Sequence, residues 1–313
     1  LFKSRESMYL WHQTLVPPSV VHNACSGHFV NENAIHVAFS MGRTIALHLF
    51  DRGILHPAMT QLFPFCIKHM RSFSLQNYPN DLLVSTTDSR HLLLLHYSRE
   101  TGLLDPLVDM PLPEEDGITG DYLETDDASQ LILVGSLMSS FVVYSVAFNE
   151  GEALLHAIHH TCPSTLFCDM KLDTVNGTPY VLSLSRTFDS PRSTSCSIFR
   201  IDWKEDEESV KPICTYAVSP TSNRLFLRRY SGSDHVVITH EKGFTFASFP
   251  SGSVASIVFS VSSLVTACLS LNSSLLFLLD TGGFITYTGG ILRTISVAAS
   301  EDSLLLGRSG SSR

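Results

Sequence analysis

The sequence predicts an all-β protein, and more closely a seven-bladed β-propeller. A strand–turn–strand pattern recurs along the chain, a further strand-like run precedes each copy, and helical periodicity is confined to one short stretch. The copies start about 40 to 55 residues apart, a spacing typical of four-stranded propeller blades. With 313 residues, 44% of them hydrophobic and 16% charged, the chain can bury a large core. The low charge disfavours a disordered tail or a coiled coil.

Each repeat contains a hairpin. An apolar run leads into a short polar turn rich in Gly, Asp, Ser or Lys, and a second apolar or alternating run follows. β-branched and aromatic residues around such turns are typical of antiparallel strand pairs. The hairpins cover Ile35–Phe50, Leu82–Tyr97, Leu131–Val146, Tyr180–Trp203, His235–Phe249 and Leu275–Thr288.

A third strand precedes each hairpin, and a short polar joint separates the two. A fourth strand is expected between repeats, at the outer edge of each blade, where half-exposed residues leave the weakest signal. The preceding strands are expected at Ala24–Val30, Cys66–Leu75, Ile118–Leu123, Leu166–Leu172, Arg224–Tyr230 and Leu264–Leu271.

The last repeat is partial. Ile295–Ala299 and Ser303–Gly307 resemble the start of a seventh unit, and the sequence given stops at Arg313. An unpaired blade edge is a liability, so Tyr9–Val16 is a candidate for one missing strand. We therefore expect residues 1–313 to form a single propeller whose seventh blade is incomplete at its C-terminal end. We also expect further chain beyond Arg313, and aggregation or early melting of these residues on their own.

Three segments fit the repeat less well. Glu150–His160 has helical spacing but precedes a proline, so a short helix and a strand both remain open. Pro106–Gly117 and Lys204–Glu208 carry acidic clusters and are expected to be solvated loops.

One segment has the length of a membrane span. No charged side chain lies between Lys242 and Asp280. However, many serines together with Pro250, Gly252 and Asn272 divide it into strand-sized pieces. The segment therefore favours buried strands joined by serine-rich turns, and no membrane contact is expected.

Cysteine and histidine offer no metal site. The seven cysteines are scattered without a CxxC pair, which favours reduced thiols in a nuclear or cytosolic protein. His159 and His160 lie near Cys162 and Cys168, but adjacent side chains of a strand point to opposite faces and cannot easily meet at one ion. No metal-binding residue is predicted.

No catalytic motif is present. GxSxG, GxGxxG, GxxxxGK[ST] and HExxH patterns are all missing from the sequence. Asp121, Glu124, Asp126 and Asp127 cluster where a loop is expected and are interpreted as turn formers, with a glycosidase-like acid pair as the alternative. The sequence thus predicts no catalytic residue, no cofactor and no small-molecule substrate.

The charge balance disfavours direct nucleic-acid binding as the main activity. Thirty acidic against twenty-one basic residues give a net charge of −9. The segment Arg224–Tyr230 interleaves arginines with aromatic residues, and in a strand Arg224, Phe226 and Arg228 share one face. A strand with one face in polar surroundings accounts for this pattern, and RNA contact through it is the alternative.

The N-terminal region carries a resemblance to a known family. Leu10-Trp11-His12-Gln13-Thr14-Leu15 and, further on, Gly27-His28-Phe29 resemble the opening of the triple-propeller family. That family comprises the large propeller subunit of splicing factor 3b, damaged-DNA-binding protein subunit one and the large subunit of the cleavage and polyadenylation specificity factor. The opening looks most like the splicing factor 3b member. Weaker similarity continues at Asp81–Tyr97, Leu131–Val146 and Leu276–Tyr287.

The resemblance implies the N-terminal propeller of a much longer, non-enzymatic scaffold. For the splicing factor 3b member, the implied partners are a large helical-repeat subunit and a very small helical subunit within the nuclear U2 snRNP, with RNA contacted indirectly. The alternatives within the family are a cullin ubiquitin ligase adaptor and a polyadenylation factor. A propeller hydrolase is the alternative from another class. No partner-binding residue is assigned.

Overall fold

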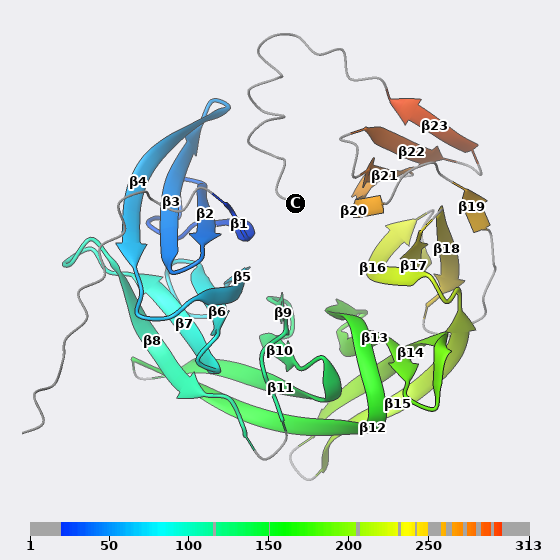
Figure 1. The fold of residues 1–313 in the computed structure, drawn as a ribbon. Helices are drawn as coiled ribbons and strands as arrows, with labels where there is room; N and C mark the ends of the chain where they lie inside the picture. Colours follow the sequence, from blue (N-terminus) through cyan, green and yellow to red (C-terminus); the bar gives the residue numbers. More distant parts are fainter. Residues whose placement is uncertain are drawn as a thin grey trace, which may run out of the picture.

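The computed structural model shows an all-β protein with no helix in the part it describes (Figure 1). The predicted all-β class is therefore confirmed. The structure describes residues 20–114, 117–149, 151–204, 207–230, 233–241, 243–249, 258–260, 265–271, 274–279, 283–288 and 291–295.

The described strands form six four-stranded antiparallel blades, in chain order from the innermost strand outwards. Blade 1 comprises β1 (Asn23–Gly27), β2 (His36–Met41), β3 (Thr44–Asp51) and β4 (Ile54–Leu62). Blade 2 comprises β5 (Ile67–Phe73), β6 (Leu82–Thr87), β7 (His91–Tyr97) and β8 (Leu104–Pro111). Blade 3 comprises β9 (Tyr122–Asp126), β10 (Leu131–Gly135), β11 (Met138–Asn149) and the first part of β12 (Glu152–Val175). Blade 4 comprises the second part of β12 together with β13 (Thr178–Thr187), β14 (Ser190–Lys204) and β15 (Glu207–Val218). Blade 5 comprises β16 (Ser222–Tyr230), β17 (Ser233–His240), β18 (Gly243–Ser248) and β19 (Val258–Ser260). Blade 6 comprises β20 (Val265–Leu271), β21 (Ser274–Leu279), β22 (Phe284–Thr288) and β23 (Ile291–Ile295).

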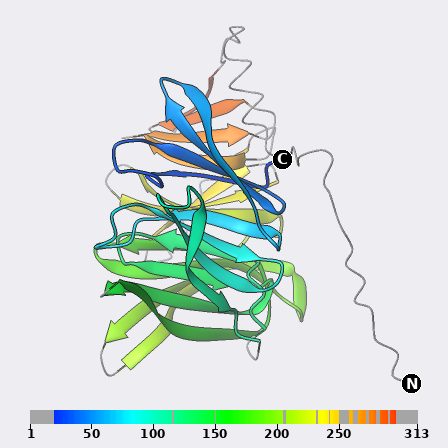
Figure 2. The same cartoon turned by 90° about the vertical axis from the view of Figure 1, so that its left-hand side faces the viewer.

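The blades lie side by side around a common centre, and blades 1 and 6 are the two ends of the described arc (Figure 1). Figure 2 views the same arc of blades edge-on, with the blue and cyan strands of blades 1 and 2 in front. Each predicted hairpin is found. The strands predicted for a seventh blade, Tyr9–Val16, Ile295–Ala299 and Ser303–Gly307, fall outside the described residues, apart from Ile295 at the end of β23.

The 24-residue strand β12 joins two blades into one seven-stranded sheet. Residues 152–161 pair with β11 as the outer strand of blade 3, and residues 165–175 pair with β13 as the inner strand of blade 4. Within the predicted segment Glu150–His160, this settles the choice in favour of a strand from Glu152 onwards, and Glu150 lies outside the described residues. The long strand β12 also corrects the expectation of a separate strand at Leu166–Leu172. The chain turns the corner at Pro163 and Ser164, where Ser164 has a φ of +57°.

Among the described residues, the hydrophobic core is divided into five clusters, one between each pair of neighbouring blades. In the blades that have a described neighbour on each side, the second and third strands are covered on both faces, whereas β2 of blade 1 and β21 of blade 6 alternate between buried and half-buried residues. All residues of β6 and β10 are therefore buried. Burial on both faces explains why these strands appear in the sequence as continuous apolar runs rather than as an alternation. Each of these clusters is built from residues of two neighbouring blades, so the blades depend on one another for their cores.

The outer strands carry prolines at irregularities in pairing. Pro57 in β4, Pro106 in β8 and Pro212 in β15 each lie where the register with the third strand shifts. Proline has no N–H to donate, so it is tolerated at edges and bulges, where it also blocks pairing with other chains. The expectation of a loop at Pro106–Gly117 was therefore wrong for its first half, because β8 extends from Leu104 to Pro111.

The segment without charges contributes strands rather than a membrane helix. Its described parts belong to β18, β19, β20 and β21, and the last of these alternates between buried and half-buried side chains. Among the residues that the structure describes, no helix has the length and apolar character needed to cross a bilayer.

A glycine fixes the connection into blade 3. The strand expected at Ile118–Leu123 starts only at Tyr122, because Gly120 has a φ of +70°. Thr86 donates a hydrogen bond to the Gly120 carbonyl at 2.9 Å. A Cβ atom at Gly120 would lie 3.0 Å from both Thr86 Cβ and Leu112 Cδ1, whereas one at Gly117, with a φ of +66°, would meet open space.

We expect Gly120→Ala to destabilise the protein more than Gly117→Ala. Both variants place an L side chain in the left-handed region of backbone conformation. The resulting backbone strain is therefore the same for the two variants. Only Gly120→Ala also overpacks the interface, which adds about 1–3 kcal/mol to the loss of unfolding free energy. Urea unfolding of both variants measures the difference. Equal midpoints would contradict the close approach described above.

Candidate functional site: the polar centre of the ring

The innermost strands place charged side chains around the centre of the ring. A cavity of about 280 Å³ is lined by residues of β5, β9, β12 and β16 and of their flanking segments. The charged groups on its wall are Arg71, Asp121, Glu124, Asp169, Lys171 and Arg224.

Irregular pairing recurs in these inner strands. The register shifts between Ile67 and His69 in β5, between Phe167 and Asp169 in β12, and between Ser222 and Arg224 in β16. A bulge of this kind redirects the side chains next to it. Several of the residues around the cavity, among them His69, Asp169 and Arg224, lie directly beside such a bulge.

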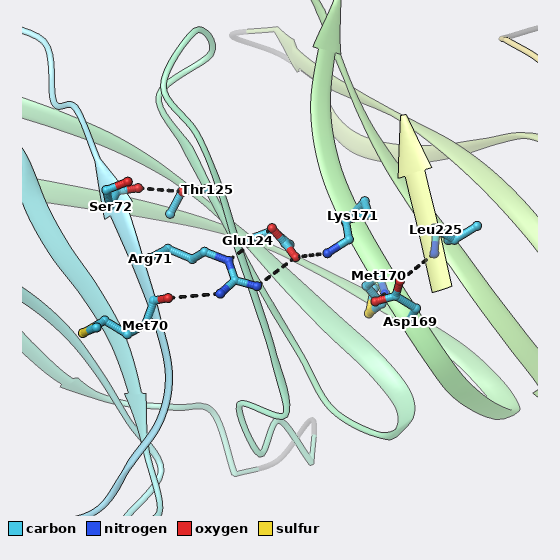
Figure 3. A network of polar contacts seen from close by, with 9 residues as sticks. All are labelled: Met70, Arg71, Ser72, Glu124, Thr125, Asp169, Met170, Lys171 and Leu225. Carbon is cyan, nitrogen blue, oxygen red and sulfur yellow. Dashed lines mark hydrogen bonds and ion pairs between the residues drawn. The ribbon is translucent and has the colours of Figure 1, made fainter. Parts of the chain in front are cut away.

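Glu124 connects three blades (Figure 3). Arg71 of blade 2 donates from Nη2 to Glu124 Oε1 at 3.2 Å and from Nε to Oε2 at 3.4 Å. Lys171 of blade 4 donates to the same Oε1 atom. Burial alone would raise the pKa of Glu124, but the two cations outweigh it and hold the pKa below its usual value. The carboxylate is therefore ionised and shared between both cations.

Asp121 forms a second joint between blades 2 and 3. Lys68 Nζ lies 2.6 Å from Asp121 Oδ1 and also donates to the Thr119 carbonyl at 3.1 Å. The Leu137 amide donates to Asp121 Oδ2 at 3.0 Å. Burial opposes ionisation, yet Lys68 and these donors lower the pKa of Asp121.

Asp169 links blades 4 and 5. Its Oδ2 atom accepts from the Leu225 amide at 2.7 Å, and its Oδ1 atom accepts from the Met170 amide at 3.0 Å (Figure 3). Burial raises the pKa of Asp169 despite the nearby charge of Lys171. Both oxygens are thus already engaged by backbone donors.

Acidic residues also tie blades together away from the cavity. Asp81 Oδ2 of blade 2 accepts from the His28 amide at 2.7 Å, and Asp127 Oδ1 of blade 3 accepts from the Ser74 amide at 3.0 Å. In both cases, the acidic residue precedes the second strand of its own blade. Its partner is a backbone amide just after the first strand of the preceding blade. The acidic character of the chain is partly explained by these joints.

The expectation that the acidic cluster forms turns is half right. Asp126 ends β9 and accepts hydrogen bonds from Ser129 Oγ and the Ala128 amide, as a turn former does. Glu124, in contrast, lies within β9, and its partners come from other repeats. The sequence signal that could have revealed them is a charged residue in the inner strand of each successive repeat: Arg71, Glu124 and Lys171.

The histidines and cysteines considered as metal ligands do not converge. The His160 ring packs 5.0 Å from that of Phe141 and 5.1 Å from that of Phe199. Cys162 packs against the core between blades 3 and 4, and Cys168 against the core between blades 4 and 5. Among the described residues, no three side chains of His, Cys, Asp or Glu are grouped as metal ligands.

The basic strand Arg224–Tyr230 is used chiefly for packing. Arg228 lies over the Phe226 ring at 5.7 Å, and its Nε donates to the Cys268 carbonyl of blade 6 at 2.9 Å. Leu225 belongs to the core between blades 4 and 5, whereas Phe226 belongs to the next core. The two faces alternate as predicted, and Arg228 is engaged in a joint rather than available as a nucleic-acid contact.

Buried and half-buried histidines make stability dependent on pH. Burial lowers the pKa of His36, His48, His69, His160 and His240. In the unfolded chain these rings bind protons near pH 6.5, whereas in the fold they remain neutral to lower pH. The contribution of these neutral rings to the free energy of unfolding is therefore complete above about pH 6.5 and is lost as the pH falls below it. We expect the urea midpoint to decrease between roughly pH 7.5 and 5.5. An unchanged or higher midpoint at the lower pH would contradict this assignment.

Comparison with known proteins identifies the fold. Residues 20–240 match the family model described as "RSE1/DDB1/CPSF1 first beta-propeller". The chain belongs to this family. Its members are propeller scaffolds in splicing, DNA binding and polyadenylation. The chain is also similar to a protein named "Probable splicing factor 3B subunit 3" from Dictyostelium discoideum, with 22% identity over 142 residues. The match covers 44% of this chain and 11% of that protein.

Proposed function

We propose that this chain is a non-enzymatic interaction scaffold of the splicing factor 3b complex in the nucleus. There it would support recognition of the pre-mRNA branch site by the U2 snRNP. Its direct partners are the large helical-repeat subunit and the very small helical subunit, through which it acts on RNA indirectly. The proposal includes no membrane, cofactor or small-molecule substrate.

The observation that carries this proposal is the family match from blade 1 into blade 5, together with the similarity to a splicing factor 3B subunit. The polar centre supports the scaffold role. A ring whose internal charges pair with one another is rigid, and its loops then offer surfaces for partners.

A propeller hydrolase is the second candidate, because the centre holds carboxylates whose pKa values are shifted apart. The pKa of Asp169 is raised, and the pKa of Glu124 is lowered. That combination is typical of an acid–base pair. However, Asp169 accepts two backbone N–H groups, and both Glu124 oxygens accept from cations. A general base needs an oxygen directed at water or substrate, so the geometry favours the scaffold.

Affinity purification of the full-length protein followed by mass spectrometry tests the proposal. We expect the helical-repeat and very small subunits of splicing factor 3b to be recovered in stoichiometric amounts. Recovery of cullin subunits or polyadenylation factors instead would favour the other family functions and contradict ours.

We further propose that Tyr9–Val16, Ser303–Gly307 and the part of Ile295–Ala299 beyond Ile295, which itself ends β23 of blade 6, contribute strands to a seventh blade. The end faces of the arc support this. On blade 1, the half-buried ring of Phe39 packs edge-on against His48, 5.3 Å away, and Leu269 of blade 6 is exposed. Deletion of residues 1–19 from the full-length protein is expected to lower the melting temperature. Unchanged melting would oppose a strand from that segment.

A further inference from the structure

We propose that a second cavity, at the junction of blades 1 and 2, binds an extended proline-rich peptide carrying a basic residue. The cavity has a volume of about 420 Å³ and shares no lining residue with the cavity at the polar centre. That volume is within the range of ~300–1,000 Å³ typical of ligand pockets, whereas the central cavity is smaller. The inference deepens the proposed scaffold function and rests on it.

Three connections on one face of the ring build this cavity. Asn31, Glu32 and Asn33 come from the β1–β2 connection, Tyr78 and Asn80 from the β5–β6 connection, and Tyr97 with Arg99 from the end of β7. All three connections lie at the same ends of their blades, because alternate turns of an antiparallel blade face the same side.

The cavity walls are held in place before any ligand arrives. The His28 and Asp81 segments exchange two hydrogen bonds, one at 2.7 Å to the Asp81 carboxylate and one at 3.2 Å to the His28 carbonyl. The Tyr78 ring packs edge-on against that of Phe148 at 5.0 Å. Walls that are already ordered reduce the entropy lost on binding.

The polar groups of this cavity are available, unlike those of the ring centre. Within the described part of the chain, the side chains of Glu32, Asn80, Tyr97 and Arg99 have neither a hydrogen bond nor an ion pair. At the centre, by contrast, Arg71, Lys171 and Glu124 satisfy one another. Free polar groups beside aromatic walls are what a recognition site needs.

The chemistry of these groups selects the ligand. Asparagine amides, a tyrosine hydroxyl and a guanidinium are hydrogen-bond donors. A polyproline II segment has no internal hydrogen bonds, so its carbonyl groups are free to accept, and its rings pack on tyrosine. Glu32 at the rim would pair with a basic residue of the peptide.

The charge of the cavity argues against RNA as the ligand. Arg99 is the single cation among the cavity-lining residues, all of which are described, and Glu32 opposes it. The chain as a whole has a net charge of −9. A nucleic acid would need several cations to neutralise its phosphates.

Fluorescence anisotropy of the purified full-length protein tests the site. The probe is a fluorescein-labelled peptide of eight prolines followed by one arginine. We expect saturable binding to the native protein and a loss of affinity of about tenfold or more in Tyr97→Ala, because an aromatic anchor is removed. Phe188→Ala is the matched control. It truncates an exposed aromatic side chain in the β13–β14 turn, on the opposite face of the ring, and should bind as the native protein does.

Several results would overturn the site. These are absence of saturable binding, equal losses in Tyr97→Ala and Phe188→Ala, or equally tight binding of a glycine–serine peptide with the same terminal arginine. Tighter binding of a ten-nucleotide uridine RNA that Tyr97→Ala abolishes would assign the cavity to RNA instead. Because the titration uses the protein alone, its failure leaves the partner purification unaffected, so the two proposals fail separately.

Discussion

Phe141→Ala is expected to reduce the free energy of unfolding by about 3–5 kcal/mol, the range for deleting a buried aromatic side chain. Phe141 is fully buried in β11, between blades 3 and 4. Its ring lies 5.7 Å from that of Phe199 and 6.2 Å from that of Phe167, which come from two different strands of blade 4. The variant would therefore open a cavity at an interface on which both blades depend.

Urea unfolding followed by tryptophan fluorescence measures this loss, since Trp203 packs against the same cluster. Phe188→Ala serves as its control. That ring is 50% exposed, so its truncation should change stability by no more than roughly 0.5 kcal/mol. Similar effects in both variants would show that the core between blades 3 and 4 is not packed as described.

Glu124→Gln is expected to reduce the free energy of unfolding by about 3 kcal/mol. Removing one member of a buried charge group leaves its partners uncompensated, which costs about 3–5 kcal/mol when burial is complete. Here Arg71 and Lys171 keep 33% and 26% of their side-chain surface exposed, so the lower end applies. The variant preserves the shape of the side chain, so the loss reports on charge.

Glu114→Gln is the matched control for that variant. Glu114 also pairs with an arginine, Arg90, at 3.8 Å, but its side chain is 84% exposed. Solvent screens such a pair, and its loss should cost about 0–1 kcal/mol. If Glu124→Gln were as mild as Glu114→Gln, the centre would not be a joint between blades.

The sequence was most informative where burial is two-sided. The hairpin strands Leu82–Thr87 and Leu131–Gly135 are fully buried, and their apolar runs were visible without any structure. The outer strands were harder to predict, because Pro106 signals a loop although an edge strand tolerates it at a bulge. The sequence Cys162-Pro163 suggested the end of the helix or strand before it, whereas β12 continues through these residues at the corner between two blades.

The sequence shows that charged residues recur in the inner strands of the repeats, but it does not show which of them pair at the polar centre. Glu124 appeared among turn-forming acids because its neighbours in sequence are Thr125, Asp126 and Asp127. Its actual partners, Arg71 and Lys171, lie 53 and 47 residues away in the inner strands of other blades. Such pairing depends on the register between blades, which the pattern within a single repeat does not specify.

A double-mutant cycle across blades 3 and 4 tests the central claim most directly, namely that the charged centre is an internal joint of a scaffold. The free energies of unfolding of Glu124→Gln, Lys171→Met and the double variant would be compared with that of the native protein. We predict a coupling of roughly 0.5–3 kcal/mol, with the double variant less destabilised than the sum of the two single variants. Strictly additive losses would mean that these side chains do not hold the blades together, and would contradict the account.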